Sequence, residues 1–569
     1  MDFNLADDPW LPAVLTDGSV TQMSALSVLL RAREVRSLAL DTPSQVPPVL
    51  RLLLAVVHRA QQGPADDEEW LEWWKAGAFD AGLIEKYVGE HRPRFDLFDP
   101  LAPFLQVGGL QALTGKTKSV ALLVPHIASG NNVPLFSAQR DAAPEPMSAA
   151  QAARWLVHAH AWDTAAIKTG AVGDPRAKDN KTTGNPVGSL GQLGVVIPTG
   201  PTLWHTLMYN LLPADPDDQD PGGEDRPVWE REPLTAAWTK RTPQGRLDLY
   251  TWPARRIRLI PEPDPDQPGG IAVRQVLVCG GDRLATDNGQ QLRRWMQSEP
   301  HTAWKRSTNL ERKHTFQPVY WPVRHPVERQ LWRGLGPLLA HAQATSPSTG
   351  RDAPLQRRPT VLARLGSRVQ AAALRGIPIQ LLAVGIEYGN KAAVIDEAYA
   401  DVLPMPVAAL AADDRTWRDA ILEAVETTAR AATALADLAS NLAEAAGCRD
   451  DHLLGGHRER AREQAYATLD SPFRRWLANL SAEDADPDEA LDQWARQIRN
   501  TVRRLAGELL AEIPPAAFFG RTVKKGDGTE PMDATIAEIW FNRALRKALN
   551  SLMTADDPDE PGSTGLETA

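Results

Sequence analysis

The chain has 569 residues, of which 43% are hydrophobic, and a formal net charge of −10 at pH 7. This length is enough for several domains with cores of their own. No apolar run is long enough to cross a membrane, and the first residues lack the basic and apolar regions of a secretory signal. We therefore expect a cytoplasmic protein with no membrane partner. Its two cysteines, Cys279 and Cys448, lie far apart in sequence, which excludes a disulfide framework and a zinc site built from thiolates.

The acidic excess is concentrated in two segments. Residues 213–226 carry six acidic residues and one arginine, and residues 554–569 carry five acidic residues and no base. The remainder of the chain has equal numbers of acidic and basic residues, with basic runs at 239–258 and 351–375. Such runs are typical of a solvated surface and also suit a nucleic-acid backbone. The net charge therefore does not exclude a nucleic-acid partner.

The first part of the chain predicts a hairpin followed by helices. Prolines and an Asp-Gly pair break residues 3–20 into two short strands. Apolar residues occupy nearly every position of 49–58, which indicates a buried helix. A tryptophan-rich helix follows near 70–74, and a further helix is predicted over 148–168.

Two polar loops in this part are candidate contact surfaces. Residues 125–140 form a polar loop with an apolar tip at 133–136 that no periodicity would bury. Residues 168–194 are rich in Gly, Lys and Asn, and a loop of this length inside a compact chain is usually functional or disordered. Its glycines allow close approach of a partner, and its basic side chains suit phosphates. It contains no P-loop match, so ATP binding has little support.

The middle of the chain predicts an irregular mixture of helices and strands with no regular βαβ repeat. Strands are predicted at 195–197, 258–260, 273–279 and 377–384. Helices are predicted at about 201–212, 325–344 and 360–374.

The last third of the chain predicts an antiparallel four-helix bundle. Apolar residues recur at three-four spacing, with short connections, in segments at 414–446, 455–480, 491–509 and 533–553. The expected fold class is therefore α+β, a large irregular mixed α/β N-terminal domain followed by this C-terminal bundle. We expect domain limits at 1–410 and 411–555, with an acidic disordered tail at 556–569.

A catalytic constellation is not found in the sequence. The pairs His158 and His160, and His452 and His457, have no third ligand at a metal spacing, which favours structural roles. No nucleophile elbow, metal-nuclease or kinase signature occurs. We expect no enzyme, no catalytic residue, no metal and no cofactor.

The stretch Tyr388-Gly389-Asn390-Lys391 lies between two apolar segments and predicts a tight projecting turn. Its tip, Asn390, Lys391 and Ala392, presents an amide, an ammonium and a methyl group together. That combination suits hydrogen bonding to base edges, phosphate contact and close approach to stacked bases. On local sequence alone, an ordinary hairpin or strand-to-helix loop is the favoured interpretation of the stretch, and the rest of the chain changes that balance.

Several motifs, in order along nearly the whole chain, resemble the CasA family, the large subunits of the type I-E CRISPR surveillance complex Cascade. They are Asn4-Leu5 with Asp8 to Pro12, Phe95 to Phe98 with Pro103 to Gln106, Ser129 to Asn132, Ala165 to Asp174, and Val384 to Ile395 ahead of a four-helix bundle. Each motif alone is weak, whereas their order and spacing together are specific.

The resemblance implies a non-enzymatic subunit that reads the protospacer-adjacent motif (PAM) in double-stranded target DNA. It also implies wedging of the duplex to promote pairing with the guide RNA, and recruitment of a separate helicase-nuclease. The implied DNA-binding and PAM-binding residues are Gly170, Ala171, Val172, Gly173, Asn390, Lys391 and Ala392. The family's glutamine wedge is replaced here by Lys391, which puts base-edge hydrogen bonding at that position in doubt. The tract Gly184 to Gly194 is an alternative for the glycine loop.

The resemblance also implies partners other than DNA. The loop that meets the crRNA end and a neighbouring Cascade subunit resembles the segment containing Asn131, Asn132, Leu135, Phe136 and Ser137. A basic side chain from the body reaches the minor groove in the family, for which Arg283 and Arg293 are candidates. One alternative hypothesis is a protein-interaction scaffold that uses the bundle and binds no DNA. A second is a hydrolase whose catalytic residues the sequence does not reveal.

Overall fold

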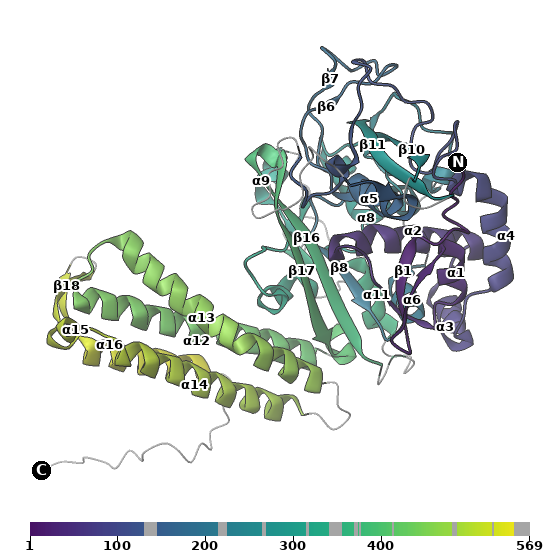
Figure 1. Ribbon diagram of the computed structural model, residues 1–569. Helices are drawn as coiled ribbons and strands as arrows, with labels where there is room; N and C mark the ends of the chain where they lie inside the picture. The colour runs from purple at the N-terminus through teal and green to yellow at the C-terminus, as the bar shows by residue number, and fades with distance from the viewer. Residues whose placement is uncertain are drawn as a thin grey trace, which may run out of the picture. The chain divides into compact units, whose positions relative to one another are not determined.

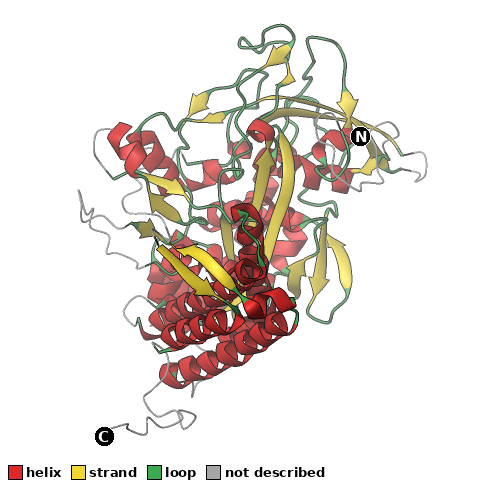
Figure 2. Cartoon of the chain, turned by 90° about the vertical axis from the view of Figure 1, so that its left-hand side faces the viewer, coloured by secondary structure: helices red, strands yellow, loops and turns green. Residues whose placement is uncertain are grey.

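The computed structural model describes residues 1–129, 145–213, 225–264, 269–313, 318–340, 355–368, 374, 377–411, 415–480, 486–525 and 528–550. The chain divides into two compact units, Met1–Leu403 and Pro404–Ala569. The first mixes helices and strands, and the second is mainly helical (Figure 1, Figure 2). This is the α+β class expected from the sequence, with a mixed N-terminal part and a C-terminal helical bundle.

The N-terminal unit begins with a small antiparallel sheet and a group of helices. The sheet has the order β2-β1-β3, and β1 and β2 form the predicted hairpin. Helix α2 buries most of its residues, as the apolar run at 49–58 predicted. The elements are β1 (Leu11–Leu15), β2 (Val20–Met23), α1 (Ala25–Leu30), β3 (Val35–Leu38), α2 (Val46–Gln61), α3 (Asp67–Ala76) and α4 (Ala81–His91).

A second sheet has the order β10-β11-β6-β7, and the segment between its last two strands contains Gly170 to Gly173. Strands β4 and β5 also pair with β11. The elements are β4 (Lys118–Ser119), β5 (Met147–Ser148), α5 (Ala149–Trp162), β6 (Lys168–Thr169), β7 (Lys181–Thr182), β10 (Arg255–Pro263) and β11 (Ile271–Gly280). Helix α5 ends at Trp162, so the helix predicted over 148–168 was too long. Its C-cap, Asp163, turns the backbone out of the helix with φ −58° and ψ 150°.

A third sheet, of order β17-β16-β8, carries the predicted projecting turn (Figure 1). Strand β16 (Ile379–Gly389) pairs antiparallel with β8 (Val195–Thr199) and continues into β17 (Val394–Met405). The last β16 residue that pairs with β8 is Val384, which pairs with Val195. Strand β16 therefore continues five residues beyond this pair, to Gly389.

Shorter elements complete the N-terminal unit. They are α6 (Leu203–Asn210), β9 (Lys240–Arg241), α7 (Arg246–Tyr250), β12 (Arg283–Leu284), α8 (Gly289–Ser298), β13 (Trp304–Arg306), α9 (Thr308–Lys313), β14 (Tyr320–Pro322), α10 (Leu335–Leu338), β15 (Gln356–Arg357) and α11 (Thr360–Arg368). The helix predicted over 325–344 was too long. Within the described part of that range the chain forms only a 3-10 turn, Leu331–Gly334, and the short α10.

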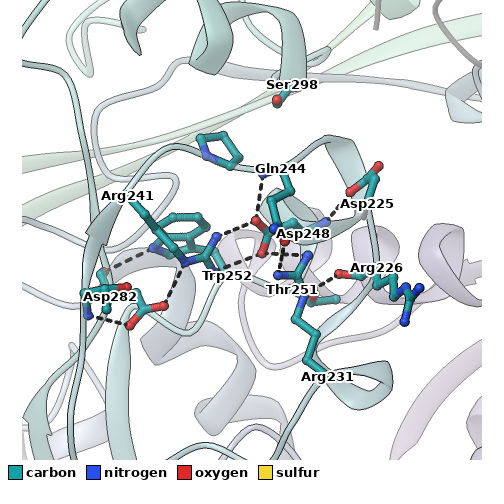
Figure 3. A network of polar contacts seen from close by, with 12 residues as sticks. Asp225, Arg226, Arg231, Arg241, Gln244, Asp248, Thr251, Trp252, Asp282 and Ser298 are labelled. Atoms are coloured by element: carbon teal, nitrogen blue, oxygen red, sulfur yellow. Dashed lines mark hydrogen bonds and ion pairs between the residues drawn. The ribbon is translucent and has the colours of Figure 1, made fainter. Parts of the chain in front are cut away.

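Most of the basic run at 239–258 is buried or partly buried, whereas Lys240 is exposed and pairs with Asp287 at 2.5 Å. Arg255 and Arg256 are buried. Arg241 donates to both carboxylate oxygens of Asp248, at 2.5 and 3.0 Å, and its Nε donates to Asp282 at 3.1 Å (Figure 3). Buried guanidinium groups require such partners because removing a charge from water without compensation is costly. The arginines therefore hold the N-terminal unit together.

The C-terminal unit is built on the antiparallel bundle that the three-four spacing predicted. The bundle helices are α12 (Thr416–Ala446), α13 (Asp451–Asn479), α14 (Pro487–Ala511) and α16 (Ala534–Leu549). Between the last two lie α15 (Pro515–Phe519) and an antiparallel hairpin of β18 (Arg521–Lys525) and β19 (Gly528–Met532). The apolar stripe of α14, including Trp494, Ile498 and Val502, is buried. Trp494 Nε1 donates to Thr428 Oγ1 at 3.0 Å and joins α14 to α12.

Candidate nucleic-acid interface

The projecting turn is a strand-to-strand tip with an unusual backbone. Asn390, Lys391 and Ala392 have positive φ angles of 36°, 59° and 57°, so three consecutive non-glycine residues occupy the left-handed region. Asn390 and Lys391 are exposed and Ala392 is half-buried. Left-handed backbone is unfavourable for residues with a Cβ and persists only where surrounding contacts impose it. Contacts from outside the tip must therefore hold its three residues in this conformation.

The tip is fastened to the chain segment that follows α5. Tyr388 Oη donates to Trp162 O at 2.7 Å, and Ala165 N donates to Ala392 O at 2.7 Å. Burial raises the pKa of Tyr388, so its hydroxyl remains a donor. Gly389 lies against Asp396, whose carboxylate would overlap a Cβ at position 389. These contacts fix the tip on both of its sides.

The glycine turn, Gly170 to Gly173, leaves β6 with one part anchored and one part exposed. Gly170 O accepts from Leu113 N at 2.9 Å, and Val172 N donates to Gln111 O at 2.9 Å. Ala171 is buried in an apolar cluster with Leu277 and Cys279. Val172 is 51% exposed, and Gly173, with φ +87°, is exposed beside it. The turn therefore presents a small apolar side chain and bare backbone on a fixed base.

The alternative tract, Gly184 to Gly194, is mainly structural. Gly188 N donates to Asp163 O at 2.8 Å, and a Cβ at Gly188 would overlap the backbone of Ala161. Gly191, also buried, packs against Tyr388. These glycines allow the chain to close over the end of α5, which accounts for them without a partner. Exposure favours Gly170 to Gly173 over this tract as the contact turn.

Asp163 connects the tip to the glycine turn. Its carboxylate pairs with Lys168 Nζ at 2.7 Å and with Arg255 Nε. Burial alone would raise the pKa of Asp163, but the two cations hold it to about 2. Burial lowers the pKa of Lys168 to about 8, against the opposing effect of Asp163. Lys168 begins β6, and Asp163 is two residues from Ala165, so one ion cluster supports both candidate contact elements.

Sequence reasoning missed Asp163 and Tyr388 as anchoring residues. Asp163 lay inside the helix predicted over 148–168, and its partner Arg255 is 92 residues away in sequence. Because the end of α5 was itself mispredicted, the local sequence offered no sign of this role. Of the two body cations, Arg283 lies beside Gly184, whereas Arg293 is an exposed residue of α8.

Several predicted features are structural or lie outside the described residues. Asn131, Asn132, Leu135, Phe136 and Ser137 all fall within the undescribed range 130–144. His158 and His160 are buried, with Nε2 atoms 3.0 Å from Ser44 Oγ and 2.9 Å from Leu105 O, which are structural contacts.

Among the described residues, no group of three or more His, Cys, Asp or Glu side chains is arranged to hold a metal ion. A separate search of the same residues finds no helix with both the length and the apolar character needed to span a bilayer.

Comparison with known proteins identifies the family. The family model described as CRISPR-associated protein Cse1 matches residues 4–505. A CasA/Cse1 protein of Thermus thermophilus is 39% identical over 268 residues, which is 46% of this chain and 50% of the relative, so the match spans about half of that protein. The crystal structure of Thermobifida fusca Cse1 is similar with a TM-score of 0.83, 36% identity, and coverage of 96% of this chain and 98% of that one.

Other solved structures share the fold. The Cse1 structure from Acidimicrobium ferrooxidans has a TM-score of 0.81 at 31% identity, covering 97% of this chain and 99% of that one. A chain of a structure titled CRISPR RNA-guided surveillance complex has a TM-score of 0.62 at 18% identity, covering 89% of this chain and 99% of that one, which shows likeness of fold alone. On the family model and the two Cse1 structures, this chain belongs to the CRISPR-associated Cse1 family.

Proposed function

We propose that this chain is the large subunit of a type I-E CRISPR surveillance complex that recognises the PAM in double-stranded target DNA. In this role the tip Asn390, Lys391 and Ala392 starts to separate the strands beside the PAM, and the glycine turn Gly170 to Gly173 lies against the groove. The subunit then hands the opened DNA to guide-RNA pairing and recruits a helicase-nuclease. It performs no catalytic step itself and works in the cytoplasm.

One observation carries the proposal: an exposed left-handed tip is joined by a backbone hydrogen bond, Ala165 N to Ala392 O, to the segment that leads into the exposed glycine turn. Backbone strain at an exposed position is a reason to infer function. A small rigid wedge beside bare backbone suits insertion at a base step and close approach to a groove.

The free-energy cost of strand separation is consistent with a subunit that begins to open the DNA duplex while pairing with the guide RNA completes the opening. Separating DNA costs about 1–2 kcal/mol per base-pair step, so one wedge can start the process while guide pairing completes it. The minor groove presents a degenerate pattern of hydrogen-bond donors and acceptors, so a protein that contacts the PAM there tolerates related PAM sequences. The Lys391 ammonium adds attraction to phosphate in place of the amide of the family's glutamine.

The remaining parts of the proposal concern partners. The loop that contains Asn131, Asn132, Leu135, Phe136 and Ser137 contacts the crRNA end and a neighbouring subunit. We assign domain limits of 1–410 for DNA reading and 411–555 for the bundle, with residues 556–569 as an acidic tail. Family membership supports the role proposed for the loop, and the two compact units, which divide between Leu403 and Pro404, lie close to the proposed domain limit.

The decisive experiment purifies the chain with crRNA-bearing partner subunits and measures binding to a labelled duplex that carries a PAM and a matched target. Lys391→Ala removes an exposed ammonium at the tip and should weaken duplex binding about tenfold, or about 1.4 kcal/mol. Assembly with the crRNA should be unchanged. The matched control is Lys75→Ala, which removes an exposed lysine from α3.

A second substitution tests the glycine turn. Val172→Glu places a carboxylate on an exposed side chain of the turn, and repulsion from phosphates should reduce duplex binding at least tenfold. Val20→Glu makes the same change at an exposed valine in β2 and should have no effect on binding. If assembled complexes with Lys391→Ala and Val172→Glu bind the duplex normally, the DNA-reading role is wrong and the scaffold hypothesis is favoured.

A further inference from the structure

Two arginines share one tryptophan next to the glycine turn. The guanidinium carbons of Arg176 and Arg283 lie 4.2 and 3.9 Å from the ring centroid of Trp238. Arg176 Nη1 also donates to Trp238 O at 2.8 Å, and Arg283 Nη2 donates to Thr183 O at 2.7 Å. Within the described ranges, neither guanidinium forms an ion pair. Stacking on an indole orients a guanidinium while its N–H edges can still donate.

The base of this stack is held by the polar network of Figure 3. Trp238 precedes β9 and Arg283 begins β12, and these two strands pair. Asp282, which precedes Arg283, accepts hydrogen bonds from Thr239 N at 3.2 Å, Arg241 Nε at 3.1 Å and Arg256 Nη2 at 2.6 Å. The stack is therefore fixed before any ligand arrives, which lowers the entropy cost of binding.

The charges around the stack do not balance. Asp174 is a buried carboxylate whose oxygens accept from Trp238 Nε1 at 3.2 Å, Thr182 Oγ1 at 2.9 Å and Arg176 N at 2.9 Å. This single negative charge faces two guanidinium groups. Burial and the nearby positive charge of Arg176 both lower the pKa of Arg283, as expected for like charges held together.

Two exposed lysines lie further along the same loop, and although the exposed Asp179 stands between them, residues 176–181 keep three basic side chains against one acidic side chain. Lys178 and Lys181 exchange backbone hydrogen bonds of 2.9 Å across the turn that leads into β7. Both are exposed, and neither ammonium has an ion-pair partner in the described part of the chain. Gly170 N donates to Asn180 O at 2.8 Å, so this turn is bonded to the glycine turn. The cations thus stand beside the residues proposed to approach the groove.

We propose that Arg176, Lys178 and Lys181 form a phosphate clamp that grips the backbone of duplex DNA beside the glycine turn, with Trp238 and Arg283 as positioning residues. The clamp supplies affinity that does not depend on base sequence, because phosphate contacts carry no direct sequence information. This inference rests on the proposed function, since it takes duplex DNA as the partner. It adds a division of labour within one loop, in which the glycine turn faces the groove and the cations hold the strand.

The test is the salt dependence of duplex binding by the complete crRNA-bearing complex. Each phosphate contact contributes about 0.9 to the slope of log affinity against log salt, so Lys178→Ala with Lys181→Ala should lower the slope by about two between about 50 and 200 mM salt. Arg176→Gln should lower it by about one. The ratio of affinities for duplexes with correct and incorrect PAMs should stay unchanged.

The matched control is Lys75→Ala with Lys86→Ala, which removes two exposed lysines from α3 and α4 and should leave the slope unchanged. The clamp is wrong if the Lys178 and Lys181 variant keeps the full slope, if the control loses as much, or if PAM discrimination or crRNA assembly falls instead. Failure of the clamp with intact effects of Lys391→Ala and Val172→Glu leaves the proposed function standing. Failure of all three removes both.

Discussion

At the residue scale, the tip at 390–392 shows how a strained backbone is retained. A left-handed non-glycine residue costs about 1–2 kcal/mol, and three stand in succession here. The hydrogen bonds from Tyr388 Oη and to Ala392 O compensate this cost from outside the tip. Both bonds end on residues Trp162 and Ala165, on either side of Asp163. The stability of the tip therefore depends on Asp163, which lies far from the tip in sequence.

Asp163→Asn tests this dependence. The substitution leaves Lys168 and Arg255, both buried, without their carboxylate, and loss of one partner from a buried ion pair costs about 3–5 kcal/mol. Denaturant unfolding of the full chain measures the change. The control Asp7→Asn breaks an exposed pair with Arg92 and should cost less than about 1 kcal/mol. Equal effects of the two substitutions would contradict the assignment of Asp163 as an anchor.

The same carboxylate predicts a pH dependence. Its pKa is held to about 2, below the ordinary value of 3.8, so the native state favours the charged form. The stabilisation is complete above about pH 4 and disappears as the pH falls through 2, because protonation in the native state removes the ion pairs. The difference in free energy of unfolding between the unsubstituted chain and Asp163→Asn should therefore narrow from pH 4 to pH 2. A constant difference over this range would contradict the prediction.

At the element scale, the sequence predicted the elements that their own apolar pattern stabilises and missed those that depend on partners distant in sequence. Helix α14 was predicted because its apolar side chains at three-four spacing are the same ones that the bundle buries. The end of α5 was not, since Asp163 leaves the helix to meet Arg255 from a distant strand. The burial of Arg255 and Arg256 was not predicted either, for the same reason. A run of charges does not reveal that Asp282, 41 residues from Arg241 in sequence, will be brought against it.

Bundle packing makes a separate prediction. Ile498 is fully buried on α14, so Ile498→Ala should destabilise the bundle by about 2–5 kcal/mol through lost burial and a residual cavity. Arg504→Ala removes an exposed ion pair with Glu508 on the same helix and should cost about 0.5 kcal/mol or less. Thermal unfolding measures both. A loss at Arg504 as large as that at Ile498 would argue against the packed stripe.

At the scale of the whole molecule, the chain divides into two compact units. Units of this kind can unfold independently, and substitutions without shared partners should have additive effects. Calorimetry of the full chain should show two transitions, one lowered by Asp163→Asn and the other by Ile498→Ala, and the double variant should show both shifts unchanged. A single transition moved by either substitution would contradict this independence.

The backbone anchors of the tip have a consequence for how its chemistry can vary. Hydrogen bonds from Tyr388 and Ala165 fix the backbone around residue 391, and neither bond involves its side chain. A different side chain at position 391 should therefore leave the backbone conformation of the tip unchanged. Exchange of Lys391 for Gln should alter which motif is preferred without altering the unfolding midpoint, so motif preference can drift while the fold stays constant.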